Sequence, residues 1–411
     1  MSSVCNECVL NEEAEIEEVP IDVGAGQREE GGEAPKPLKR VRPIPPGERR
    51  PRGIPPSKVP WYSRLLWRLH NDSQFLRTLI QFTFVLLCLW IGIEFHLFVR
   101  WGLTNGNSPY IVRPPGVEGF LPISALISLK YWIEGGVVNT IHPSGLFILI
   151  AILASGLLLK KAFCSWLCPV GTLSESLWML GEKLFGRNLR VTKWIDYPLR
   201  SLKYLLLLFF VNAIARMDVP ALRTFIESPY NTMADVKMYL FFVNISSSAL
   251  WSIVMLVLLS VIVKNFWCRY LCPYGALLGA MSVFSPLKIT RQKKNCIDCE
   301  LCTRACPSAI PVHRVTRVWS DECTACYKCV EVCPVKETLD MRTTKSGRAV
   351  SALVFGSLLV WVFVAVTGLA MIAGSWQNNI SKEEYMRRFQ DLDTQAYEHF
   401  GSEGKTDAAG R

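Results

Sequence analysis

The sequence predicts an α-helical integral membrane protein of about five spans, with a small cysteine-rich α+β domain placed before the last span. Half of the 411 residues are hydrophobic and 19% are charged, whereas a soluble protein carries about 25% charged residues. Five apolar stretches approach the roughly 20 residues that cross a bilayer. Most of the 15 cysteines lie in the pair Cys164/Cys168 or between Cys268 and Cys333. These observations exclude a soluble enzyme, a secreted disulfide scaffold and a disordered protein.

Residues 1–60 are expected to form a tail of two parts. Residues 1–35 are acidic and poor in apolar side chains, so we expect them to be disordered. Residues 36–60 are rich in proline and basic residues, which indicates an extended linker at an anionic membrane surface. The net charge of +10 is typical of cytoplasmic loops in a membrane protein, and we expect no nucleic-acid partner.

The expected spans divide the rest of the chain into domains. Four of them, at 77–99, 143–160, 200–216 and 248–264, belong to a membrane domain at 61–285. The fifth, at 349–374, is free of charge and lies in a C-terminal segment at 346–375, which a polar tail at 376–411 follows. Lys203 lies within the third span, so its amine is expected to extend to the membrane surface.

Basic residues predict how these spans are oriented. The linker before the first span, the segment 160–203 and the segment 264–348 are basic, whereas the segments 100–142 and 217–247 hold few basic residues. Basic loops stay on the cytoplasmic side. We therefore expect a multi-pass protein of the cytoplasmic (inner) membrane, with the N-terminus and the cysteine-rich domain inside and the C-terminus outside. Cytoplasmic thiols stay reduced, which disfavours disulfides.

An internal repeat links two halves of the membrane domain. The stretch FCSWLCPVGTL at 163–173 matches WCRYLCPYGAL at 267–277, and each stretch follows a span that runs from outside to inside. Two copies with the same orientation predict a parallel repeat about an axis along the membrane normal. The two CxxxCP turns should then lie near each other beneath the membrane.

Two cysteine runs in the domain at 286–345 carry the clearest chemical signal. CIDCELCTRACP at 296–307 and CTACYKCVEVCP at 323–334 both read C-x2-C-x2-C-x3-C-P, the pattern of two-cluster [4Fe–4S] proteins. Zinc sites use two CxxC pairs instead. The fourth cysteine of each run ligates the other cluster. We therefore assign one cluster to Cys296, Cys299, Cys302 and Cys333, and the other to Cys323, Cys326, Cys329 and Cys306.

The remaining cysteines allow several interpretations. The pairs Cys164/Cys168 and Cys268/Cys272 could hold an additional metal or cluster, form a thiol redox centre, provide a docking turn, or be buried structural thiols. Cys88 lies inside the first span, where packing is the simplest role. Cys5 and Cys8 lie in the acidic tail without a second pair of ligands.

A quinol site would require proton-accepting groups at membrane depth. Glu94 and His96 near the end of the first span, and His142 at the start of the second, are the candidates. The alternative is that all three lie at headgroup depth, where they cost little. The two histidines could also be imagined as haem ligands, although both lie at helix ends.

These motifs together resemble the NapH/YccM-like membrane polyferredoxins. The resemblance covers roughly 60–375 and includes RPPGVEGFLPI, KKAFCSWLCPVGTLSE, WCRYLCPYGALLG and CIDCELCTRACPSAIPV. It implies an iron–sulfur protein of the cytoplasmic membrane that moves electrons between the quinone pool and a protein redox partner. Such a protein is an electron carrier or a quinol dehydrogenase-like subunit and not a stand-alone enzyme. The alternative is a redox-sensing or metal-handling assembly factor whose CxxxCP thiols bind or reduce a metal such as copper.

Overall fold

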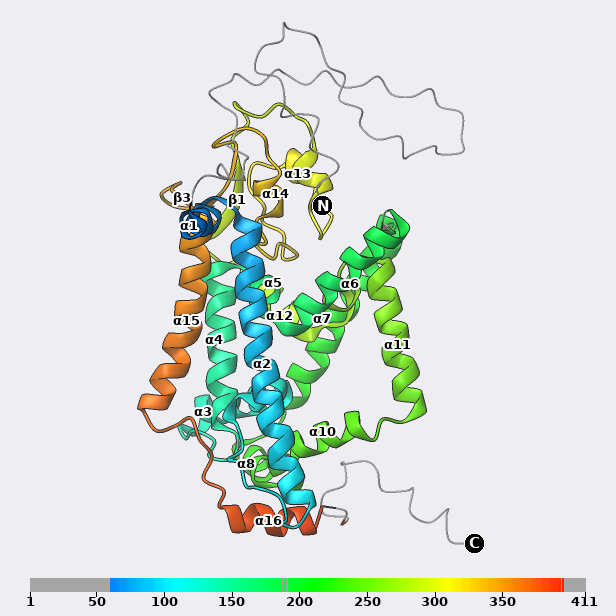
Figure 1. Cartoon of the computed structure of the whole chain (residues 1–411), viewed down its shortest axis with the longest axis vertical. Coiled ribbons are helices and arrows are strands. Elements are labelled where there is room, and N and C mark those ends of the chain that lie inside the picture. The colour runs from blue at the N-terminus through cyan, green and yellow to red at the C-terminus, as the bar shows by residue number, and fades with distance from the viewer. Residues whose placement is uncertain (1–59, 187, 190, 393, 395–411) are drawn as a thin grey trace, which may run out of the picture. The chain divides into compact units, whose positions relative to one another are not determined.

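Long helices dominate the computed structural model, which describes residues 60–186, 188–189, 191–392 and 394. The predicted N-terminal tail, with Cys5 and Cys8, lies outside these residues. Helices α2 (Ser73–Leu103), α4 (Pro143–Leu159) and α15 (Ala352–Ile372) pack side by side, as Figure 1 shows. Helix α7 (Lys193–Ala215) packs on α12 (Pro273–Ser282), and α11 (Ser247–Ile262) packs on α6 (Pro169–Phe185).

Three of the five expected spans are confirmed as helices long and apolar enough to cross a membrane. These are α2, residues Trp194–Ala215 of α7, and α15. The other two are shorter: α4 has 17 residues and α11 has 16. Helix α11 also forms a bent pair with α10 (Ala234–Val243), at an angle of 83°, and this pair could be one broken span. By length and composition, the described residues therefore contain three candidate spans, or four with the bent pair.

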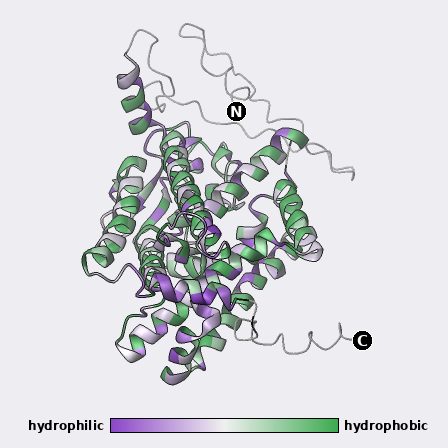
Figure 2. Ribbon diagram, turned by 60° about the horizontal axis from the view of Figure 1, so that its bottom comes forward, coloured by the Kyte–Doolittle hydropathy of each residue, from purple (hydrophilic) through white to green (hydrophobic). Residues whose placement is uncertain are grey.

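The short helix α4 is the centre of the packing. It contacts α15, α12, α3 (Pro122–Gly135) and the 3₁₀ helix η3 (Pro115–Phe120), and most of its side chains are buried. The longer helices instead expose large apolar side chains, such as Phe82 and Trp90 on α2 and Trp361 on α15. Figure 2 shows that hydrophobic residues occupy much of the helical part of the molecule. Apolar surface on this scale fits contact with lipid.

Polar caps fix where the helices begin. Asp72 accepts hydrogen bonds from the first backbone N–H groups of α2, and Ser351 does the same for α15. The preceding helix α1 (Trp61–Asn71) ends at Asp72, so the two helices meet at this cap.

Helix α16 (Lys382–Gln390) packs on the end of α2 that is far from its cap, as Figure 1 shows. Helix α8 (Val219–Glu227) packs on α3 and on α9 (Pro229–Thr232). The Phe389 ring of α16 lies where a Cβ on Gly102 would be, at 2.3 Å, so α16 can pack this closely only against a glycine.

The cysteine-rich module, residues 286–345, is held by a three-stranded antiparallel sheet. Its order is β1 (Leu287–Arg291), β2 (Leu339–Thr343) and β3 (Ala349–Val350), with Leu287 opposite Thr343 and Arg291 opposite Leu339. This register joins the two ends of the module. The segment between them holds only short helices: α13 (Leu301–Arg304), η5 (Val312–Arg314) and α14 (Lys328–Glu331).

Candidate functional site

The eight cysteines of the two runs line two separate cavities in the module. Arg291, Glu300 and His313 border the first-run cavity, whose cysteines are Cys296, Cys299, Cys302 and Cys333. The second-run cavity contains Cys323, Cys326, Cys329 and Cys306. Each quartet thus takes its fourth cysteine from the other run, which is the crossed grouping expected from the spacing.

Both cysteine loops use the same unusual backbone. Asp298 and Glu300 in the first run have positive φ, and Ala325 and Tyr327 occupy the same positions of the second run with φ of 52° and 58°. A non-glycine residue in this conformation costs about 1–3 kcal/mol. Such a fold turns backbone N–H groups inward, and the N–H of Leu301 indeed donates to the sulfur of Cys299. The loops are therefore built to hold sulfur that carries negative charge.

Burial makes these thiols poor acids in the absence of a cation. Together with the charges of neighbouring thiols, it raises the pKa of Cys302 to about 11 and that of Cys306 to about 12. Iron would supply the positive charge that lets four thiolates coexist. The donor set therefore fits an iron–sulfur cluster, which supplies one-electron transfer when bound. The described ranges contain no group of three His, Cys, Asp or Glu placed for a single metal ion.

The second-run loop lies directly on the membrane helices. Its backbone carbonyls accept hydrogen bonds from Ser165 (to Thr324, 2.6 Å), Trp166 (to Ala325, 3.0 Å) and Gln74 (to Cys326, 3.0 Å). Ser165 and Trp166 belong to α5 (Ala162–Trp166), which is the first CxxxCP turn. The first repeat therefore docks the loop that surrounds the second-run cavity.

A buried ionic cluster strengthens this docking. Arg77 of α2 makes two hydrogen bonds of 2.7 Å to Glu175 of α6, and Lys328 of the module lies 2.6 Å from the same carboxylate. Burial opposes ionisation of Glu175, but Arg77 and Lys328 outweigh it and lower its pKa to about 2. One carboxylate thus joins two membrane-domain helices to the module.

Lys203, whose amine is expected to extend from its span to the membrane surface, reaches the cysteine-rich module. Its side chain is 0% exposed and pairs closely with Glu322 of the module. Lys161 reaches the same carboxylate at 4.0 Å, while the adjacent Tyr204 donates to Asp321. A buried partner thus replaces water for this charge, because the module covers the end of α7.

The four CxxxCP cysteines also come together, in a third place. Cys164 and Cys268 line a further cavity with Lys161, and Cys326 of the second run borders it as well. Cys168 and Cys272 are the N-caps of α6 and α12. Burial raises the pKa of Cys164 to about 12 and that of Cys168 to about 11, and the charge of the neighbouring Cys272 contributes to both increases. The second turn is the π-helix η4 (Trp267–Leu271), a form frequent at functional sites.

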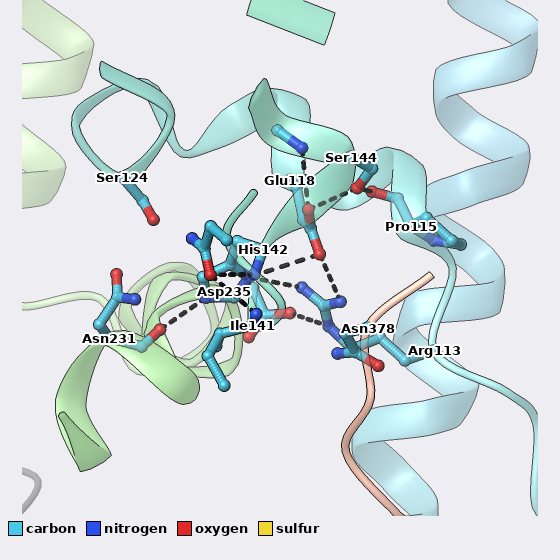
Figure 3. Close-up of polar contacts among 12 residues, drawn as sticks. Arg113, Pro115, Glu118, Ser124, Ile141, His142, Ser144, Asn231, Asp235 and Asn378 are labelled. Atoms are coloured by element: carbon cyan, nitrogen blue, oxygen red, sulfur yellow. Dashed lines mark hydrogen bonds and ion pairs between the residues drawn. The ribbon is translucent and has the colours of Figure 1, made fainter. Parts of the chain in front are cut away.

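At the far end of the helices, charged residues form the network of Figure 3. Arg113 donates to Asp235 at 2.5 Å and to Glu118 at 2.8 Å, and it lies 3.2 Å from Nδ1 of His142. Burial disfavours the Glu118 carboxylate, but the Arg113 charge outweighs it and lowers the pKa of Glu118 to about 2. The network ties η3, α4 and α10 together.

The three residues considered for a quinol site lie in two different environments. Glu94 accepts a hydrogen bond from Trp90 at 3.0 Å, and His96, which is exposed, contacts the Tyr239 hydroxyl at 2.6 Å. His142 is 1% exposed, and both of its ring nitrogens have partners, Arg113 on one side and the Asn231 carbonyl on the other. No nitrogen of His142 is thus left for a haem iron. Cys88 is half-buried in α2.

Sequence reasoning missed the acidic members of these clusters, which are Glu118, Glu175, Asp235 and Glu322. A weak signal was present, because a buried carboxylate in an apolar stretch needs a cation. Their partners could not be identified from the sequence, since Arg77 and Glu175 are 98 residues apart and Lys203 and Glu322 are 119 apart.

Two family models match the chain. The 4Fe–4S binding domain model matches twice, at residues 141–188 and 245–292, and each match contains one CxxxCP turn. The 4Fe–4S dicluster domain model matches residues 289–341, which hold all eight cysteines of the two runs. No solved structure matches the chain.

Curated relatives agree with these models. YccM of Escherichia coli strain K12, described as an electron transport protein, is 42% identical over 345 residues, which is 83% of this chain and 95% of YccM. The ferredoxin-type protein NapH of the same strain is 28% identical, over 65% of this chain and 88% of NapH. The regulatory protein NosR of Pseudomonas aeruginosa is 28% identical over 45% of this chain and 25% of NosR. The chain therefore belongs to the NapH/YccM-like family of membrane polyferredoxins, which are 4Fe–4S electron-transport proteins.

Proposed function

We propose that this protein relays electrons between the quinone pool and a protein redox partner through two [4Fe–4S] clusters. The observation that carries the proposal is the pair of cavities lined by the crossed quartets. The first-run cluster would be held by Cys296, Cys299, Cys302 and Cys333. The second-run cluster would be held by Cys323, Cys326, Cys329 and Cys306.

The two clusters would have different neighbours. Three carbonyls of the second-run loop accept hydrogen bonds from side chains of α2 and α5, so its cluster would be the one that exchanges electrons with the membrane domain. The first-run loop carries exposed residues such as Lys293, Lys294 and Asp298. The first-run cluster would therefore be the one that a protein partner reaches.

The positive-inside pattern supports a cytoplasmic module and a C-terminus outside. The same pattern supports five spans, with α4 and the bent α10–α11 pair included. Glu94 lies 17 residues beyond Arg77 in α2, roughly 26 Å along the helix axis. Because the module contacts the other end of α2, a role for Glu94 or His96 in quinol chemistry would be proton exchange, with electrons entering nearer the module.

A metal-handling function is the second candidate, because three of the four CxxxCP thiols, those of Cys164, Cys268 and Cys272, lie near Lys161. A protein of this kind would reduce or transfer a soft metal ion such as copper. Supplying Cu²⁺ to the reduced protein and following Cu⁺ formation with a chelator distinguishes the two candidates. Turnover abolished by Cys164→Ser but unaffected by Cys306→Ser would favour metal handling over the relay.

The relay can be tested with two matched cysteine variants. Dithionite-reduced protein in lipid nanodiscs is mixed with a menaquinone analogue, and reoxidation of each cluster is followed by EPR. In Cys302→Ser the first-run cluster should be lost, while the second-run signal still disappears at the wild-type rate. In Cys306→Ser the second-run cluster should be lost, and the first-run signal should stay reduced because its route to the quinone is broken.

Nanodiscs without quinone provide the control for spontaneous oxidation. The proposal would be overturned if quinone left the wild-type signals unchanged. Equal reoxidation of the first-run cluster in the wild type and in Cys306→Ser would contradict the proposed order of the clusters.

A further inference from the structure

The CxxxCP cavity is lined by matching positions of the two repeats. Aligning the two motifs places Cys164 with Cys268, Lys161 with Asn265, and Ser165 with Arg269. All six residues line this one cavity. The two turns therefore face each other across it, as the parallel repeat predicts.

Both turns also place a cysteine at a helix N-terminus. The N–H of Gly275 donates to the sulfur of Cys272 at 3.3 Å, and the N–H of Gly171 faces the sulfur of Cys168. These backbone donors and the helix dipoles favour sulfur in its thiolate form.

Lys161 supplies the independent observation that something anionic belongs here. Its side chain is 3% exposed, and its one ion pair within the described ranges is with Glu322 at 4.0 Å. That carboxylate already has a closer partner in Lys203. A Cβ on Gly275 would lie 3.6 Å from Nζ of Lys161, so the ammonium of the first repeat points at the second turn. Lys161 and Lys203 thus share the Glu322 carboxylate, and a negatively charged occupant beside the thiols would bind the Lys161 ammonium from its other side.

We propose that Cys164, Cys168, Cys268 and Cys272 together hold a third iron–sulfur cluster, ligated across the two repeats. An iron–sulfur cluster on four thiolates is anionic, which the Lys161 ammonium would balance. As with the two quartets of the module, the four sulfurs are not arranged for a single ion. Cys326 borders the same cavity, so this centre would lie next to the second-run cluster. The inference rests on the proposed relay and adds a redox centre between the membrane helices and the module.

The step at the third cluster is a transfer of one electron. The reduced third cluster would lose one electron and the oxidised second-run cluster would gain it, or the reverse. No bond breaks and no proton moves. Lys161 would act as a positioning residue, because its charge favours the reduced, more negative form of the cluster.

Iron counting on anaerobically purified protein tests the proposal. A third cluster predicts about 10 iron atoms per chain if it is [2Fe–2S] and about 12 if it is [4Fe–4S], with matching acid-labile sulfide, whereas the module alone gives about 8. The double variant Cys164→Ser/Cys268→Ser should fall to about 8 and keep both EPR signals of the module. Cys88→Ser removes a thiol that lines none of the three cavities described above, so it should retain the full count.

Lys161→Asn provides a second measurement that leaves all four ligands in place. It introduces the residue that the second repeat has at the matching position, Asn265. We expect the iron count to stay at the wild-type value and the reduction potential of the third signal to fall, while the potentials of the module clusters stay unchanged.

Three results would overturn the inference. The first is about 8 iron atoms per wild-type chain with both module signals intact, and this result would leave the relay standing. The second is one equivalent of zinc or copper bound at these thiols in place of the additional iron. The third is protein without any iron, which would overturn the relay as well.

Discussion

At the scale of single residues, the structure depends on buried charges that connect the membrane helices to the cysteine-rich module. Glu175 forms ion pairs with Arg77 of α2 and Lys328 of the module, and Glu322 forms one with Lys203 of α7. Removing one member of such a pair leaves an uncompensated buried charge, which costs about 3–5 kcal/mol. These pairs should therefore determine how firmly the module is docked.

Substitution of Glu175 tests this directly. Glu175→Gln should destabilise the protein by about 3–5 kcal/mol, because Arg77 and Lys328 lose their shared anion. Glu182→Gln on the same helix is the matched control, since its pair with Lys264 is largely exposed and contributes at most about 1 kcal/mol. Thermal unfolding in detergent should show a clearly lower melting temperature for Glu175→Gln and almost no change for Glu182→Gln. Equal melting temperatures for the two variants would contradict the role given to Glu175.

Acid should weaken the same contact. The pKa of Glu175 is lowered from 4.5 to about 2, because Arg77 and Lys328 outweigh the effect of burial. A carboxyl group whose pKa is lower in the folded state than in the unfolded state stabilises the fold. This stabilisation is fully present above the unfolded-state pKa and is lost as the pH falls towards the folded-state pKa. The contribution at neutral pH is about 3 kcal/mol.

The unfolding temperature of the wild type should therefore fall between pH 4.5 and about 2, and Glu175→Gln should show a shallower fall. Measurement of both proteins across this window in one detergent checks the prediction. If the two proteins gave parallel pH profiles, protonation of Glu175 would not be a cause of the loss of stability in acid.

At the scale of elements, repeated local geometry builds the sites. The two cysteine loops place left-handed residues at the same positions, and the two CxxxCP turns place a glycine against the carbonyl of their first cysteine. A Cβ on Gly171 would lie 2.1 Å from the carbonyl oxygen of Cys164, and a Cβ on Gly275 would lie 3.0 Å from that of Cys268. The first turn thus leaves less room for a side chain at its glycine than the second turn does.

Alanine substitutions should reveal this difference. Gly171→Ala should displace the first turn and lower both the melting temperature and the iron content, whereas Gly275→Ala should have a smaller effect in the same direction. Gly92→Ala in α2 is the control, since its Cβ would meet nothing within 4 Å and alanine favours a helix. Metal analysis with thermal unfolding of the three variants tests the order. A larger effect from Gly275→Ala than from Gly171→Ala would contradict it.

The elements differ in how far the sequence predicts them. The cysteine runs could be assigned because their spacing is local, and α15 could be assigned because its length and composition alone suffice. The expected spans at 143–160 and 248–264 form helices of only 17 and 16 residues, and α11 is bent away from α10. The network of Arg113, Glu118 and Asp235 was not predicted, because pairing between distant segments depends on tertiary packing.

At the scale of the whole molecule, the module contacts one end of α2 and α16 contacts the other. Ser73 donates to Glu331 of the module at 2.6 Å, while Gly102 packs on Phe389. A 31-residue helix therefore separates the proposed clusters from the C-terminal helix α16. If the basic loops lie inside, this separation should span the bilayer.

Orientation can be measured with two reporters in a bacterial host. Alkaline phosphatase fused after residue 392 should be active, because it requires the oxidising exterior, and a fluorescent protein fused at the same site should be dark. Fusions after residue 345 should give the reverse result. Active phosphatase at residue 345 would place the cysteine-rich module outside the cell and contradict the proposed topology.

We propose that eight cysteines hold two neighbouring [4Fe–4S] clusters by crossed ligation. EPR of anaerobic, dithionite-reduced membranes tests it most directly, with the wild type compared with Cys306→Ser and Cys333→Ser. We predict two magnetically interacting clusters in the wild type, selective loss of the second-run signal in Cys306→Ser, and selective loss of the first-run signal in Cys333→Ser. Membranes without an iron–sulfur signal, or variants that each lose the cluster of their own run, would contradict the account.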